Sequence, residues 1–347
     1  MARATITIRD VAREARVSVA TVSRALNGQH NVAEPVRKLV LEVAQRLRYT
    51  PNAAARSLSS RRTQTIGVVL PDLHGEFFSE LMRGIDGVAR GHAHHLLVSS
   101  YHGDQEQQGL ALQAMRGRVD GLLVLSPYAA NPGFLTDNLP AGLPAVLINT
   151  PGLESQHAVL RIDNHAGAMT MTRYLLGCGH RRIAFIAGPA SNHDAGERLR
   201  GFREAMAGAV EAEAIELQGG FDEASGHAAG LSLLDLGPLP DAVFAANDMM
   251  ALGCLFALTQ AGVQVPGQVS LAGFDDIPLA RFVHPSLTTM QVNIAELGGR
   301  AMSHLLQLID SPEEASASVQ TLVPMLVARN STAMHDPQAP AGVPAAP

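Results

Sequence analysis

The sequence predicts a small all-α domain with a helix-turn-helix pattern, followed by a short hinge helix and a larger α/β core. Two observations support this fold class. Residues 7–27 contain two short amphipathic segments joined by a turn, and from Thr65 onward short apolar runs alternate with segments of helix length. With 347 residues and 46% hydrophobic side chains, the chain is long enough to bury more than one core.

The two N-terminal segments have caps and apolar faces typical of short helices. Thr7 can cap the first helix, and Ser18 can cap the second. The inward positions are Ile8, Val11, Ala12 and Ala15 in the first helix, and Val22, Ala25 and Leu26 in the second. This pattern predicts a helix-turn-helix, although a pair of short helices also occurs in other all-α proteins.

The second of these helices is the predicted reading helix, because its outward residues lie near its start, where a recognition helix meets base edges in the major groove. Arg24 can bond both acceptors of a guanine, and Val19 and Ala20 can contact thymine methyl groups. The predicted DNA-facing residues of this domain are Thr7, Ser18, Val19, Ala20, Thr21, Ser23, Arg24 and Asn27.

Charge is distributed unevenly along the chain. Residues 1–62 carry 12 Lys and Arg against 4 acidic residues, a net charge of +8, whereas the remainder has a net charge of −14. A basic head on an acidic body is expected of a protein that contacts phosphates through one domain only. Because the head has helical periodicity and caps, it does not resemble a disordered basic tail.

A third helix is expected at residues 34–48, and a short Ala-rich helix at residues 52–60. A helix of nine residues is marginal alone, so this hinge segment needs a partner surface.

The body should contain parallel sheets formed from β-α-β units, because apolar runs alternate with amphipathic segments. The expected strands are 65–71, 96–100, 119–126, 145–149, 159–163, 182–188, 242–247 and 269–275.

Several of these strands end in polar residues, and ligands collect at the carboxyl ends of parallel strands. The polar residues are Asp72, Asp163, Asn247, Asp248, Asp275 and Asp276. Asp and Asn at such places can also cap the helix that follows, and we expect that role for Asp248 and Asp276. Phe77, Phe78 and Phe221 can provide stacking surfaces for a ring or can pack in the core.

The order and spacing of the motifs resemble the lac-repressor (LacI/GalR) family of transcription regulators over nearly the entire chain. After the helix-turn-helix, the matching segments are R-Y-T-P-N-A-A-A-R-S-L-S-S (48–60), T-I-G-V-V-L-P-D (65–72), V-D-G-L-L-V-L (119–125), G-H-R-R-I-A-F-I-A-G-P (179–189), A-A-N-D-M-M-A-L-G (245–253), V-P-G-Q-V-S-L-A-G-F-D-D (265–276) and P-S-L-T-T-M (285–290). The resemblance implies a two-lobed core like that of periplasmic binding proteins. One lobe would hold residues 63–162 with return segments after Gln291, and the other residues 163–290 with a final strand.

The resemblance also implies roles for individual residues. The hinge helices of two protomers would pair in the minor groove, with Leu58 inserted between base steps and Arg56 and Arg61 on phosphates. Asn52, Ala55, Arg56 and Leu58 would contact DNA. The effector would bind at Phe77, Phe78, Asp163, Asp194, Arg198, Phe221, Asn247 and Asp275. Arg16 departs from the family pattern, since relatives have Gly at this turn; a left-handed conformation there costs roughly 1 kcal/mol.

Other functional classes find little support in the sequence. There is no signal sequence and no apolar run long enough to span a bilayer, so we expect a cytoplasmic protein that does not contact membranes. Cys178 and Cys254 are expected to be buried free thiols, and no metal or cofactor is expected. His92, His94 and His95 would point to opposite faces of a strand. No nucleophile elbow, zinc-protease motif or Walker loop occurs, so the sequence does not predict an enzyme.

The expected domains are residues 1–50 (DNA binding), 51–62 (hinge), 63–333 (effector binding and dimerisation) and 334–347 (a disordered tail rich in Pro and Ala). The expected function is a homodimeric repressor that binds a pseudo-palindromic operator on double-stranded DNA and responds to a small carbohydrate. The alternatives are a purine-like co-repressor as the effector, or a small-molecule binding protein without a role on DNA.

Overall fold

The computed structural model describes residues 6–26, 31–49, 62–128, 132–311 and 317–335. The chain divides into two compact units, Met1–Thr63 and Gln64–Pro347, and each is described by itself. Of the predicted DNA-contacting residues, Asn27, Asn52, Ala55, Arg56, Leu58 and Arg61 lie outside the described residues, as does the segment from residue 336 onward.

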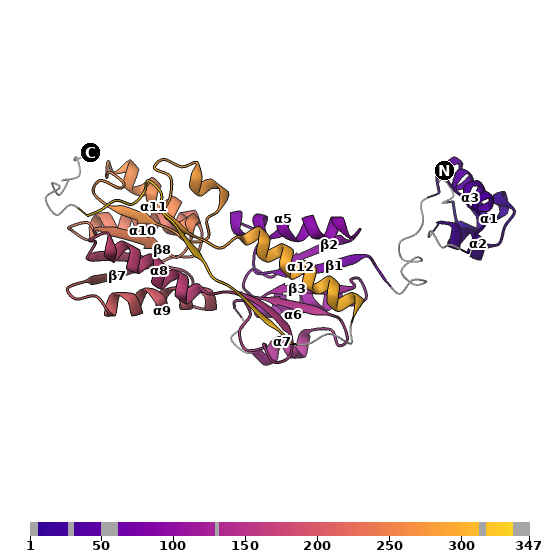
Figure 1. Cartoon of the computed structure of the whole chain (residues 1–347), viewed down its shortest axis with the longest axis horizontal. Coiled ribbons are helices and arrows are strands. Elements are labelled where there is room, and N and C mark those ends of the chain that lie inside the picture. Colours follow the sequence, from indigo (N-terminus) through magenta and orange to yellow (C-terminus); the bar gives the residue numbers. More distant parts are fainter. Residues whose placement is uncertain (1–5, 27–30, 50–61, 129–131, 312–316, 336–347) are drawn as a thin grey trace. The chain divides into compact units, whose positions relative to one another are not determined.

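The first unit contains a three-helix core (Figure 1). Its helices are α1 (Ile8–Ala15), α2 (Val19–Leu26) and α3 (Glu34–Arg46). All seven predicted inward residues contribute to this core: five are buried, while Ile8 and Leu26 pack against it partly exposed. Val40, Val43 and Ala44 of α3 complete the core.

Thr7 and Ser18 lie at the N-termini of α1 and α2, the positions predicted for them. The backbone N–H and the hydroxyl of Thr7 both donate to the Asp10 carboxylate, at 2.9 and 2.7 Å, and Ser18 Oγ accepts from the backbone N–H of Thr21 at 3.0 Å. Arg16 adopts the left-handed conformation predicted for the turn, with φ of 52°. An L side chain at this φ is strained, so the turn forms despite its residue type.

The first lobe of the second unit is built on a six-stranded parallel sheet in the order β11-β5-β4-β3-β1-β2. Its strands are β1 (Thr65–Leu70), β2 (His95–Ser100), β3 (Gly121–Leu125), β4 (Ala145–Ile148), β5 (Ala158–Ile162) and β11 (Val319–Leu322). Figure 1 shows α5 and α12 on one side of this sheet and α6 and α7 on the other. These helices are α5 (Glu76–Gly91), α6 (Gln105–Met115), α7 (Pro132–Asn138) and α12 (Ile294–Asp310).

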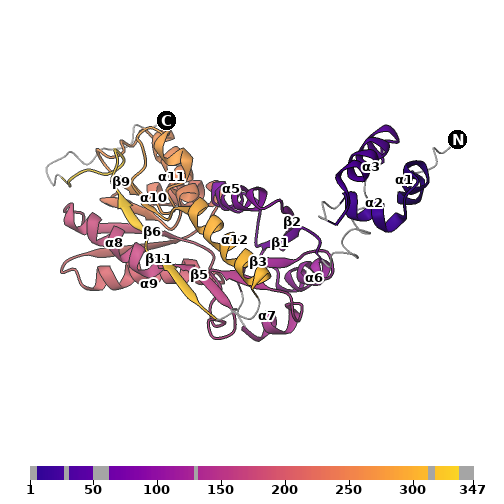
Figure 2. The same ribbon diagram turned by 45° about the vertical axis from the view of Figure 1, so that its right-hand side comes forward.

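The second lobe has a four-stranded parallel sheet in the order β7-β6-β8-β9. Its strands are β6 (Arg182–Ala187), β7 (Glu213–Gln218), β8 (Ala242–Ala245) and β9 (Ser270–Ala272). In Figure 2 the pair α8 and α9 lies on the opposite side of this sheet from α10 and α11. These helices are α8 (Asn164–Gly177), α9 (His193–Ala207), α10 (Glu223–Asp235) and α11 (Asp248–Gln260), and a 3₁₀ helix η1 (Pro278–Arg281) follows β9.

The chain crosses between the lobes at three places in the described core. It passes from β5 into α8, from β10 (Thr289–Gln291) into α12, and from β11 into β12 (Met325–Val327). Strands β10 and β12 pair with each other in antiparallel register. The last described residues then join the second lobe, since the backbone N–H of Leu271 donates to the carbonyl of Ser331 at 2.7 Å.

All eight predicted strands are present, but the sequence prediction missed β7, β10, β11 and β12. Strand β7 lies at a sheet edge and alternates between exposed and half-buried residues, so it has no continuous apolar run. The other three are short and lack a buried apolar run: β10 and β11 contain polar residues, and β11 and β12 are exposed or half-buried along their length. Cys178 and Cys254 are buried free cysteines, as predicted.

Candidate functional site

A cavity of about 390 Å³ lies between the two lobes of the core. The first lobe contributes the segments after β1, β2 and β3 and the N-terminal part of α5. The second contributes residues that follow β6, β7, β8 and β9, together with two residues of α9. Among the predicted effector-binding residues, the cavity is lined by Phe77, Phe78, Asp194, Arg198, Phe221, Asn247 and Asp275. Seven of the eight predicted residues are thus brought together.

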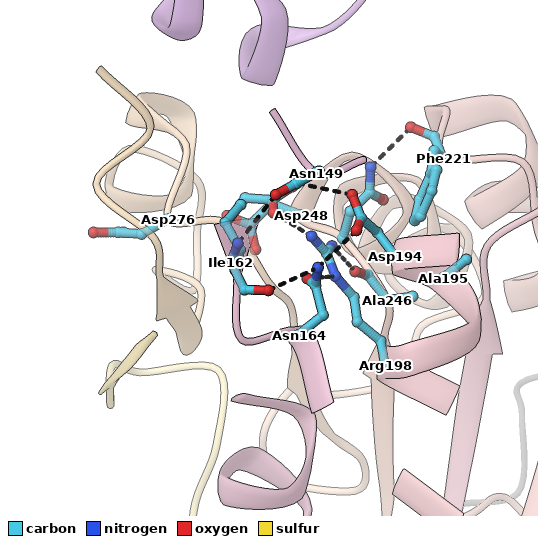
Figure 3. Close-up of polar contacts among 12 residues, drawn as sticks. Asn149, Ile162, Asn164, Asp194, Ala195, Arg198, Phe221, Ala246, Asp248 and Asp276 are labelled. Atoms are coloured by element: carbon cyan, nitrogen blue, oxygen red, sulfur yellow. Dashed lines mark hydrogen bonds and ion pairs between the residues drawn. The ribbon is translucent and has the colours of Figure 1, made fainter. Parts of the chain in front are cut away.

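Arg198 of α9 is at the centre of the polar network in this cavity (Figure 3). This residue is only 4% exposed, and its Nε and Nη1 donate to Asn164 Oδ1 at 2.7 Å and to the carbonyl of Ala246 at 2.5 Å. Its guanidinium carbon lies 3.9 Å from the ring centroid of Phe274 and 5.8 Å from that of Phe221. Hydrogen bonds and aromatic faces therefore fix the orientation of the guanidinium.

Asp275, which follows β9, forms an ion pair with Arg198 at 3.2 Å. Burial raises the pKa of Asp275 to about 6, although the charge of Arg198 opposes that rise. The ion pair is made by Asp275 Oδ1, a buried atom that Arg198 Nη2 approaches without the geometry of a hydrogen bond. A ligand hydroxyl or amine could donate that hydrogen bond.

Asp194, in the first turn of α9, holds two asparagine side chains. Its oxygens accept from Asn149 Nδ2 at 2.8 Å and from Asn164 Nδ2 at 3.0 Å. Desolvation raises the pKa of Asp194 to about 6, whereas the charges of Arg198 and His193 lower it. This carboxylate lines both the main cavity and a smaller pocket of about 220 Å³.

Asn247 has two roles in the structure. Its Oδ1 caps α11 by accepting from the backbone N–H of Met250 at 2.9 Å, and its Nδ2 donates to the carbonyl of Phe221 at 2.9 Å. The second bond places the Phe221 ring beside the cavity, at a residue whose φ is 72°.

Asp163 does not line the main cavity. Its carboxylate caps α8 by accepting from the backbone N–H of Ala166 at 3.0 Å, and it borders the smaller pocket. The sequence placed it at a strand end correctly, but could not show that it borders the smaller pocket and not the main cavity.

The capping roles predicted for Asp248 and Asp276 are wrong. Asn247 caps α11, while Asp248 accepts from Thr289 Oγ1 and from the backbone N–H of Ile277. Asp276 forms ion pairs with Arg281 and Arg329. Asp248 binds Thr289 and Ile277, and Asp276 binds Arg329; these partners are distant in sequence, so local spacing gave no indication of these contacts.

Further cavity residues were not among the predicted binding residues. The cavity is also lined by Asp72, His102, Tyr128 and Asn192. Asn164 is not part of this lining, but it accepts a hydrogen bond from Arg198. Asp72 was recognised only as a polar residue at a strand end. For Tyr128 and Asn164 no sequence signal was available, because their position depends on the packing of the lobes.

In the helix-turn-helix unit, the predicted reading helix exposes Val19 and Ala20 at its start. Val19 is 42% exposed and Ala20 is exposed, whereas Arg24 is half-buried and its Nε donates to the carbonyl of Ala20 at 3.2 Å. Ser18 Oγ and Thr21 Oγ1 lie 2.8 Å apart at the start of the helix. This face combines a guanidinium, hydroxyl groups and small apolar side chains, which suits contacts in a major groove.

Comparisons with known proteins agree with both units. Residues 7–52 match the family described as bacterial regulatory proteins, lacI family, and residues 172–332 match the periplasmic binding protein-like domain. The ribose operon repressor of Escherichia coli (strain K12) is 35% identical over 328 residues, which cover 94% of this chain and 99% of that protein.

Solved structures give the same result. The lac repressor dimer bound to operator and the anti-inducer ONPF has a TM-score of 0.84 at 28% identity, covering 94% of this chain and 99% of that one. A LacI-family regulator from Enterococcus faecium with bound ribose has a TM-score of 0.71 at 28% identity, covering 78% of this chain and 100% of that one. Within the described ranges, none of the helices has the length and apolar content needed to cross a bilayer. The chain belongs to the LacI family of bacterial regulatory proteins, and it is a DNA-binding regulator of transcription rather than an enzyme.

Proposed function

We propose that this chain is a repressor that binds a pseudo-palindromic operator as a homodimer in the cytoplasm and releases it when a small carbohydrate fills the interlobe cavity. This proposal rests on the lining of the cavity, which combines the acceptor carboxylates Asp194 and Asp275 with the aromatic side chains Phe77 and Phe221. Carboxylates accept from sugar hydroxyls, and aromatic faces cover the apolar face of a sugar ring. The names of two similar proteins also refer to ribose.

A purine-like co-repressor is the second candidate, because several aromatic rings line the same cavity and could stack on a heterocycle. The two candidates differ in sign. A carbohydrate inducer should weaken operator binding, whereas a co-repressor should strengthen it, since a ligand shifts the protein toward the lobe arrangement that it binds better.

The DNA-binding part is tested by selecting sequences from a random pool with the full chain. We expect a palindromic consensus, and we expect Arg24→Ala to lower affinity for it by about 1 to 3 kcal/mol with little change on random DNA. Equal losses on both DNAs would exclude a base contact by Arg24.

The ligand part is tested by thermal shift against a panel of neutral sugars and purines, followed by operator titrations with each compound that binds. Asp275→Ala and Arg198→Ala should abolish the response and leave ligand-free operator binding within about tenfold of wild type. A wild-type response in both variants would show that the ligand binds elsewhere.

A further inference from the structure

Asn149 lies outside the main cavity but connects its wall to the first lobe. It directly follows β4, has a φ of 45° and is 4% exposed. Its backbone N–H donates to the carbonyl of Leu160 at 2.9 Å, and its Oδ1 accepts from the backbone N–H of Ile162 at 3.0 Å. Both bonds go to β5, so this strand fixes the direction of the remaining amide group of Asn149.

That amide group reaches across to the second lobe. Asn149 Nδ2 donates to Asp194 Oδ2 at 2.8 Å, and Asp194 Oδ1 accepts from Asn164 at the start of α8. Asn164 in turn accepts from Arg198, which pairs with Asp275. Figure 3 shows the continuous chain of contacts from Asn149 through Asp194 and Asn164 to Arg198.

Other contacts between the lobes have a different character. The backbone N–H of His193 donates to the carbonyl of Pro127 at 2.9 Å, and the backbone N–H of Leu279 donates to Glu76 Oε2 at 3.0 Å. The His74 and Glu223 side chains approach to 3.3 Å at an exposed position. In contrast, the contact between Asn149 and Asp194 joins an enclosed amide to a carboxylate of the cavity wall. Breaking it leaves a buried polar group without its partner, which is the costly case.

We infer that Asn149 is a positioning residue that sets the equilibrium between the present lobe arrangement and an open one, through its hydrogen bond to Asp194 and without touching the ligand. Its consequence for gene regulation rests on the proposed function, because only there does the lobe equilibrium control operator binding. The lobe equilibrium itself is a property of the protein alone.

The network predicts which substitutions break it and which repair it. At a pH high enough to ionise both groups, Asn149→Asp places a second carboxylate against Asp194 and removes the donor. Combining Asn149→Asp with Asp194→Asn restores every bond with one direction reversed: the new carboxylate accepts from Ile162 N–H and from the new amide, whose oxygen accepts from Asn164. A role in filling space alone would not distinguish these variants, because Asn and Asp have nearly the same shape.

The experiment measures the distance between spin labels at Gln113→Cys in the first lobe and Val210→Cys in the second, both exposed positions, in the full chain without DNA or ligand. Labelled protein is mixed with excess unlabelled protein so that each dimer carries one pair. We expect Asn149→Asp to raise the ratio of a longer distance to the wild-type distance by roughly tenfold or more, and the double exchange to restore the wild-type distribution.

Wild-type distances in Asn149→Asp, or failure of the double exchange to restore them, would overturn the inference. If Asn149→Asp does not fold, the distance distribution of Asp194→Asn is compared with that of the double exchange. Identical distributions in these two variants would also overturn the inference. Because neither operator nor effector is present, these outcomes are independent of whether the proposed function is correct.

Discussion

At the scale of single residues, the cavity wall contains aspartates whose burial disfavours the ionised form of the carboxyl group. Asp275 is 4% exposed, has a φ of 116° and faces Arg198. The family resemblance identified Asp275 and Arg198, because both lie in segments with recognisable motifs. It did not identify Asn149 or Asn164, because these residues lie in separate segments of the chain and come together only in the folded core, where both donate to Asp194.

The raised pKa of Asp275 has a predictable effect on stability. Because its pKa is about 6 in the folded protein and close to 3.8 when unfolded, the folded state binds this proton more tightly. The resulting stabilisation is present at low pH and is lost as pH rises through about 6. Relative to Asp275→Asn, the wild type should therefore gain stability on the order of 2 kcal/mol between pH 7 and pH 4.

Urea unfolding of the full chain at several pH values, followed by circular dichroism, measures this difference. A difference between wild type and Asp275→Asn that stays constant from pH 7 to pH 4 would refute the predicted pKa shift.

At the scale of elements, the sequence predicted strands better than helix contacts. Apolar runs located the central strands because parallel strands are buried on both faces. Close helix packing was not visible in the sequence, although glycines mark it in the structure. A Cβ atom on Gly84 of α5 would lie 1.9 Å from the backbone oxygen of Ala295, at the start of α12. In the same helix, Gly87 has nothing within 4 Å of that position.

These two glycines provide a matched pair of substitutions. Gly84→Ala should destabilise the core by about 1 to 3 kcal/mol, because α5 and α12 must separate to admit the methyl group. Gly87→Ala should instead stabilise the chain by about 0.5 to 1 kcal/mol, because alanine favours the helical conformation. Both changes are read from thermal and urea unfolding, and similar effects in the two variants would contradict the close approach of these helices.

At the scale of the whole molecule, each lobe of the core is assembled from separate parts of the chain. Local pattern could not reveal the three crossings, because each occupies only a few residues between elements; the family resemblance implied them. The final segment returns to the second lobe at Ser331, which is fully buried. Its Oγ donates to the carbonyl of Leu271 at 2.6 Å and accepts from the backbone N–H of Thr288 at 2.8 Å.

Ser331→Ala should destabilise the core by about 1 to 3 kcal/mol, because it leaves the buried N–H of Thr288 without this acceptor. Ser303→Ala is the control, since Ser303 is exposed on α12 and its hydroxyl donates within its own helix, to Gly299. That change should stay within about 0.5 kcal/mol of wild type. Unfolding by urea compares the two, and equal stability would show that Ser331 does not anchor the final segment.

The return of the chain to both lobes also determines when each can be completed during synthesis. The ribosome must make β11 before the first sheet gains its edge strand next to β5, and it must reach Ser331 before the second lobe receives its last anchoring bonds. Domains that finish early can fold while the rest of the chain is still being made. The helix-turn-helix can do so, since its core uses residues before 50. Neither lobe can be completed before the last segment of the described chain has been made.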